Sequence, residues 1–186
     1  MRRALLGLGV LALIGASCSA QDAIGFPGCE GEGPQVIVAQ SVSSASQIPC
    51  LSGLPDGWSL SRADVGESGS VFTFDSDRAG AGAAILTLRG GCDVVSGISV
   101  PGSELDPGDN VVEPDVIDNY EEIISLDPSL RSLRSYVFEG GCVQWSFDFD
   151  REVSATLTVE LDGRLRFLSR EDFQRSLAED FLDVEL

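Results

Sequence analysis

The chain has 186 residues, of which 30 are Asp or Glu, 12 are Arg and none is Lys or His, so its formal net charge is −18. So acidic a surface repels phosphate backbones, and we expect no nucleic-acid partner. The lack of His and Lys excludes serine–histidine and cysteine–histidine catalysis, histidine-ligated metals and Schiff-base lysines within this chain.

The first 17 residues have the pattern of a secretory signal peptide. Arg2 and Arg3 supply a positive start, and Ala4–Ala16 is an uncharged run of apolar and small residues. About thirteen such residues are too few for a transmembrane helix, which needs roughly 20. We therefore expect residues 1–17 to be removed on export, which leaves 10 Arg against 30 acidic residues and a net charge of −20.

Residues 14–18, Ile-Gly-Ala-Ser-Cys, resemble the lipobox of bacterial lipoproteins, in which small residues precede the cysteine that receives lipid. Gly15 departs from that pattern, because Leu is usual at this position. Cleavage before Cys18 predicts a lipoprotein on the outer face of the cytoplasmic membrane, with the membrane as its partner through the lipid. The alternative is cleavage after Ser17 or Ala20, which gives a soluble secreted protein.

Residues 18–35 are rich in Gly, Pro and acidic residues, so we interpret them as the lipid-attachment site and a spacer. The remaining length, 36–186, fits a single extracytoplasmic domain with a hydrophobic core of its own.

Four cysteines remain besides Cys18, and an even number in an exported chain predicts two disulfides. Two of them end matching Gly-Gly-Cys tripeptides at strand edges, where glycine lets backbones approach closely. The long spacings and the lack of a Cys-x-x-Cys motif disfavour a redox or metal site, and we assign no metal ligand or cofactor. Of three possible connectivities we predict Cys92 with Cys142 and, by default, Cys29 with Cys50.

Alternation of apolar and polar residues predicts strands from Trp58 onward. Trp58–Val65 and Ser70–Asp75 form a first pair joined by a turn at residues 66–69, and Ala83–Arg89 is a third strand. The segment before them, Val36–Ile48, fits either a helix or a short strand and turn.

The clearest strand pair is Arg134–Phe138 with Val143–Phe149. The second strand places its aromatic residues on one face, which we expect to be the centre of the core. Before this pair, residues 101–119 fit a proline-rich loop, and Tyr120–Leu126 fits a short helix that ends at Asp127-Pro128.

Residues 152–168 fit either a hairpin, by alternation, or a helix, by apolar residues at every fourth position. Residues 170–182 are predicted to be a helix, with Ser169 as its N-cap and Asp172 completing a capping box. The expected fold is α+β: one antiparallel sheet, a C-terminal helix packed on one face, a second helix if 152–168 is helical, and two disulfides.

Three segments together resemble a group of uncharacterised exported, lipoprotein-like proteins of actinobacteria. The first segment, Ile48–Trp58, contains Pro-Cys and Leu-Pro-Asp-Gly-Trp. The second is Asp75–Gly80, and the third, Tyr136–Phe149, contains Gly-Gly-Cys-Val. The resemblance covers about residues 36–180, implies an extracytoplasmic α+β domain with disulfides, and favours a helix near 152–162. It implies no established activity and assigns no catalytic residue.

Four carboxylates would meet if strands 70–75 and 143–149 were neighbours, and such a cluster would suit Ca²⁺. Solvated strand ends, with a local Asp77–Arg78 ion pair, are the favoured interpretation. The sequence also fails the EF-hand pattern at Ala79 and Leu86. The four carboxylates are Asp75, Asp77, Asp148 and Asp150.

These features predict a non-enzymatic cell-envelope lipoprotein with an interaction or accessory role and no catalytic or cofactor-binding residue. The alternative is an extracytoplasmic ligand- or cation-binding sensor module. A deep pocket lined by Trp58, Trp145 or Tyr136 would favour the alternative, whereas a packed interior with a shallow surface patch would favour the first.

Overall fold

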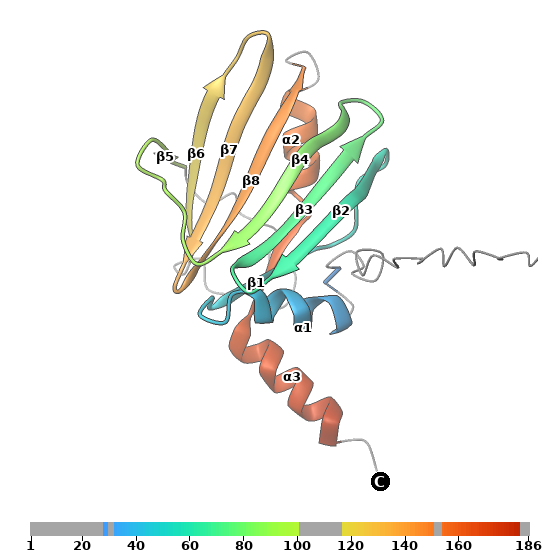
Figure 1. Cartoon of the computed structure of the whole chain (residues 1–186), viewed down its shortest axis with the longest axis vertical. Coiled ribbons are helices and arrows are strands. Elements are labelled where there is room, and N and C mark those ends of the chain that lie inside the picture. The colour runs from blue at the N-terminus through green and yellow to red at the C-terminus, as the bar shows by residue number, and fades with distance from the viewer. Residues whose placement is uncertain (1–27, 30–31, 101–116, 151–153, 183–186) are drawn as a thin grey trace, which may run out of the picture.

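The computed structural model describes residues 28–29, 32–100, 117–150 and 154–182 (Figure 1). These residues form an α+β domain with antiparallel sheets, a C-terminal helix and two disulfides, which confirms the predicted fold class, but there are two sheets where one was predicted. The predicted signal peptide, the lipidation site Cys18 and most of the proline-rich segment 101–119 lie outside the described residues.

The larger sheet has seven strands in the order β2-β3-β4-β8-β7-β6-β5, and every neighbouring pair is antiparallel. Hairpins join β2 to β3, β3 to β4, β6 to β7 and β7 to β8. The strands are β2 (Trp58–Gly66), β3 (Gly69–Ser76), β4 (Gly80–Arg89), β5 (Ile98–Ser99), β6 (Asp118–Ser125), β7 (Ser129–Phe138) and β8 (Gly141–Asp150).

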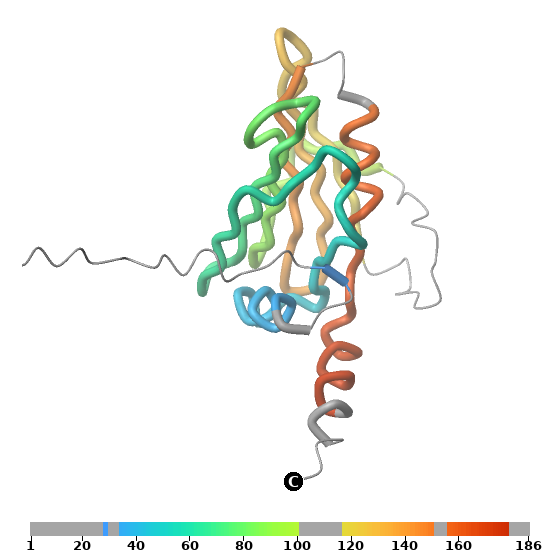
Figure 2. The backbone as a smooth tube through the Cα atoms, turned by 90° about the vertical axis from the view of Figure 1, so that its right-hand side faces the viewer, coloured from blue at the N-terminus to red at the C-terminus, as the bar shows by residue number. Residues whose placement is uncertain are grey.

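A second sheet has two strands, β1 (Gln47–Leu51) and β9 (Leu165–Ser169), which pair antiparallel. Helix α1 (Glu32–Ser41) lies across one end of the large sheet, near the end of β2 and the start of β3 (Figure 1). Helix α2 (Ser154–Asp162) lies on one side of the large sheet (Figure 2). Helix α3 (Arg170–Leu182) contacts β9 and extends beyond the end of the large sheet (Figure 1).

The core lies between the large sheet and the elements on its α2 side. The predicted aromatic face of β8 is confirmed as its centre, because Trp145 is fully buried and Phe147 and Phe149 are each 3% exposed. The rings of Phe74 and Trp145 lie 5.6 Å apart between centroids and are tilted, which is a favourable aromatic geometry. Burial of such large side chains is the main favourable term in the stability of the domain.

Within the predicted segment 152–168, the described residues form α2 followed by β9, which begins at Leu165, so the helix alternative is right for the first part and the hairpin is wrong. Leu157 and Leu161, four residues apart, are 1% and 0% exposed, and their burial favours the helix. Val36–Ile48 likewise divides between the helix α1 and the first residues of β1.

The predicted helix over Tyr120–Leu126 is wrong, because these residues belong mostly to β6. Asn119 to Ile123 pair in register with β7, and this backbone pairing outweighs the weak helical pattern of a short segment. The predicted stop at Asp127-Pro128 is the turn between β6 and β7.

Both predicted disulfides are confirmed. Cys29 bonds Cys50 with 5.0 Å between Cα atoms, and Cys92 bonds Cys142 with 5.8 Å. The first links β1 to a residue of the predicted spacer, and α1 also begins inside that segment.

Among the described residues, no helix combines the length and the apolar character that crossing a membrane requires.

Candidate functional site

A polar groove lies where the loop between β1 and β2 approaches the β3–β4 turn and the end of α2. Its volume is about 570 Å³, and a second hollow of about 480 Å³ adjoins it at Gly57 and Asp77. The groove is built from three segments that are distant in sequence. Its lining residues are Leu54, Pro55, Asp56, Gly57, Asp77, Arg78, Glu160 and Arg164.

Gly57 lets the loop and the turn meet. Its φ is +80°, and a Cβ added there would lie 2.2 Å from Oδ1 of Asp77. The backbone N–H of Asp77 also donates to the carbonyl of Gly57 at 2.9 Å. A side chain at this position would therefore displace the Asp77 carboxylate and change the shape of both hollows.

An ion pair between Arg78 and Glu160 joins the β3–β4 turn to α2. The Arg78 guanidinium donates from both terminal nitrogens to the two Glu160 oxygens, with 3.2 Å between Nη1 and Oε1. Asp77 also lies near Arg78, with 3.9 Å between Oδ1 and Nε, so the predicted local pair is present. The hydrogen bond from Arg78 lowers the pKa of Glu160, which therefore stays ionised at neutral pH and is a poor proton donor.

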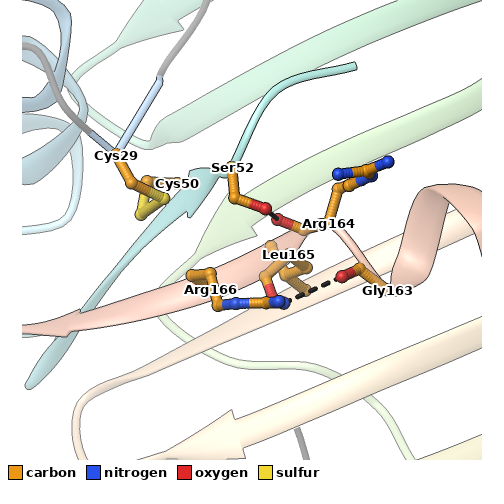
Figure 3. Close-up of a disulfide and its surroundings, with 7 residues drawn as sticks. All are labelled: Cys29, Cys50, Ser52, Gly163, Arg164, Leu165 and Arg166. Carbon is orange, nitrogen blue, oxygen red and sulfur yellow. Dashed lines mark hydrogen bonds between the residues drawn. A yellow bond between two sulfur atoms is a disulfide. The ribbon is translucent and has the colours of Figure 1, made fainter. Parts of the chain in front are cut away.

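Arg164 reaches the groove from the turn between α2 and β9. Its backbone carbonyl accepts from the N–H of Ser52 at 2.9 Å and from the Ser52 hydroxyl at 3.3 Å (Figure 3). Ser52 lies two residues after Cys50, so the Cys29–Cys50 disulfide is close to this part of the groove. The Arg164 guanidinium extends away from the disulfide (Figure 3).

A second polar cluster is internal and joins the last residue of α2 to β7. Tyr136 donates to Oδ1 of Asp162, and Arg134 donates to Oδ2 of the same residue, with a donor–acceptor distance of 2.5 Å in each case. The Asp162 side chain is 6% exposed, and Arg134 also reaches Glu121 at 3.4 Å. Burial raises the pKa of the Tyr136 phenol, so it stays protonated as a donor. The cluster positions α2, and its carboxylate is occupied by two protein donors.

The structure separates the four acidic residues considered as a cation site. Strand β4 lies between β3, which carries Asp75, and β8, which carries Asp148. Asp75 accepts from the N–H of Gly82 at 2.7 Å, and Asp148 pairs with Arg131 at 3.5 Å. Among the described residues, no group of three or more Cys, Asp or Glu is arranged to hold a metal ion.

The three aromatic residues proposed as markers of a deep pocket belong to the packed interior. Trp145, Tyr136 and Trp58 are 0%, 3% and 7% exposed, and Trp58 borders the smaller, open hollow.

Sequence reasoning did not single out Asp56, Glu160 or Arg164, because no local pattern joins them. Two of the three segments that carry the family resemblance, Ile48–Trp58 and Asp75–Gly80, meet at this groove, which is a signal only in retrospect.

No family model and no curated protein matches this chain. A crystal structure of a protein from Bacteroides thetaiotaomicron VPI-5482 matches with 13% sequence identity and a TM-score of 0.35. The match covers 69% of this chain and 47% of that chain, so it spans less than half of the other protein.

Proposed function

We propose that this chain is a non-enzymatic lipoprotein of the cell envelope, anchored through lipid on Cys18, whose folded domain has an interaction or accessory role. The observation that supports this most is the closed aromatic core: Trp145 and Tyr136 are packed inside the domain and line neither of the two hollows found in the described part of the chain. The two disulfides indicate an oxidising compartment outside the cytoplasm, which suits an exported domain.

The chemistry of the groove also favours binding over catalysis. Glu160 is held ionised by Arg78, so this pair is unsuited to general acid catalysis. The chain has no His or Lys to act as a base or nucleophile at neutral pH. The exposed groove is therefore best suited to reversible contact with another molecule.

The second candidate function is an extracytoplasmic ligand-binding sensor module, and the polar groove is the observation that favours it. The cation version has less support, because Asp75 and Asp148 each have their own protein partner. A melting temperature raised by millimolar Ca²⁺ would restore that version, and we expect no shift.

Proximity labelling in intact cells tests the leading proposal. The full chain, fused at its C-terminus to a labelling enzyme that works outside the cytoplasm, is compared with the same fusion carrying Cys18→Ser. We expect the first to label a reproducible set of envelope proteins and the second to leave the membrane fraction and lose that set. Equal fractionation and equal neighbours for the two fusions would contradict the lipid anchor and its role in placing the domain.

A further inference from the structure

We propose that the polar groove binds a small zwitterion, an amino acid or a short peptide, with the ligand carboxylate on Arg164 and the ligand ammonium on Asp56. This inference rests on the ligand-binding candidate function and names the class of ligand for the same groove.

The first argument is the state of the arginine side chains. Every other described arginine side chain forms an ion pair with a carboxylate or donates a hydrogen bond to a side-chain amide or to backbone carbonyls. Arg164 alone among the described arginines makes no such contact through its guanidinium, although the chain carries 30 acidic residues. An unpaired guanidinium that lines a groove is a ready donor for a bidentate carboxylate.

The second argument is the matching carboxylate across the groove. Asp56 comes from the loop between β1 and β2 and has no hydrogen-bond or ion-pair partner among the described residues. It makes no ion pair with Arg164, so their charged atoms are more than 4.0 Å apart. A ligand that carries both charges would satisfy the two side chains together.

The remaining charges of the groove are already matched within the protein. Arg78 is held by both oxygens of Glu160 and lies near Asp77, so it offers little to a ligand. A ligand without net charge also avoids the repulsion that a chain of net charge −18 exerts on simple anions. Leu54 and Pro55 add an apolar wall, and the volume of about 570 Å³ suits a small molecule.

The test is calorimetric titration of the mature, oxidised, full-length protein in detergent micelles with alanylalanine. Three probes are compared with it: acetate, methylammonium, and the dipeptide blocked at both ends. We expect one-to-one binding of alanylalanine, and at least about tenfold weaker binding of each of the other probes, because each lacks at least one of the two charges.

Two variants assign the contacts. Arg164→Gln and Asp56→Asn should each weaken alanylalanine binding at least about tenfold. Both residues are exposed, so the melting temperatures of the two variants should match that of the wild type. Arg175→Gln and Asp150→Asn remove exposed charges away from the groove and should change the affinity by less than about twofold.

Two results would overturn the proposal in different ways. In the first, acetate or methylammonium binds as tightly as alanylalanine, and Arg164→Gln or Asp56→Asn weakens the binding of that probe. The groove is then a ligand site, and only the ligand class is wrong. If no probe binds, or if binding is insensitive to both variants, the ligand-binding role of the groove falls as well, while the lipoprotein proposal is unaffected.

Discussion

Tyr136 donates a hydrogen bond to Asp162 inside the domain, with 2.5 Å between the phenol oxygen and Oδ1. The contact joins the middle of the large sheet to the last residue of α2, and Arg134 completes it from the same strand. Because α2 carries Glu160 and ends two residues before Arg164, this buried contact also holds two walls of the polar groove in place.

Asp162→Ala should destabilise the domain by about 3 kcal/mol, because it removes the acceptor of a buried phenol and the closer of the two carboxylates that pair with a partly buried guanidinium. Tyr136→Phe removes one donor and keeps the Arg134 pair, so we expect a loss of about 1 kcal/mol. Urea unfolding of the oxidised protein gives both values. Equal, small losses for the two variants would show that the carboxylate does not organise the cluster.

The stability of the domain should fall as the pH rises above about 10. Burial raises the pKa of Tyr136 in the folded state, whereas in the unfolded chain it stays near 10.0. The folded state therefore binds the phenol proton more tightly, so the stabilisation is complete below pH 10 and is lost at higher pH. Urea midpoints between pH 8 and 11 measure this loss, which should be smaller for Tyr136→Phe. The same pH profile in both proteins would contradict the assignment to Tyr136.

Gly140→Ala should be far more costly than Gly53→Ala. Both glycines have positive φ, +70° and +99°, so each substitution carries about 1–2 kcal/mol of backbone strain. At Gly140 the new Cβ would also lie 1.8 Å from the carbonyl oxygen of Ser44, whereas at Gly53 nothing lies within 4 Å. The turn between β7 and β8 would have to separate from the segment after α1. Unfolding free energies that differ by less than about 1 kcal/mol between the variants would argue against this close approach.

The two disulfides should contribute unequally to stability. They close loops with sequence separations of 50 for Cys92–Cys142 and 21 for Cys29–Cys50. In the chain-entropy model, replacing each pair by Ser costs about 4 and about 3 kcal/mol, respectively. Denaturant unfolding of the two double-serine variants checks the order. A larger loss for the shorter loop would mean that native-state contacts near the disulfide outweigh chain entropy.

The sequence was most predictive where local pattern and packing agree. Alternation in Val143–Phe149 reflects a strand with one buried and one more exposed face, and the structure buries the apolar positions. The two Gly-Gly-Cys tripeptides also marked a real disulfide, because Cys142, the second residue of β8, lies beside the Cys92 segment. The cause of the first signal is local, whereas the disulfide depends on the pairing of β4 with β8, which places Arg89 opposite Cys142.

The prediction failed where distant segments decide the outcome. Residues 120–126 have a mixed apolar and acidic pattern that fits a helix, and only their pairing with β7 makes most of them a strand. The groove has the same origin, because Asp56 and Arg164 are more than 100 positions apart in the sequence. A single sequence gives no signal that two such distant residues line one groove.

The central claim, a disulfide-bonded domain anchored by lipid outside the cytoplasm, is tested most directly by the intact mass of the mature protein. The protein is extracted from membranes without reduction, treated to block free thiols and measured by mass spectrometry. We expect a chain that begins at Cys18, carries a diacylglyceryl-sized increment on that residue and has no other free thiol. A water-soluble chain with an unmodified Cys18, or one that begins after it, would contradict the account.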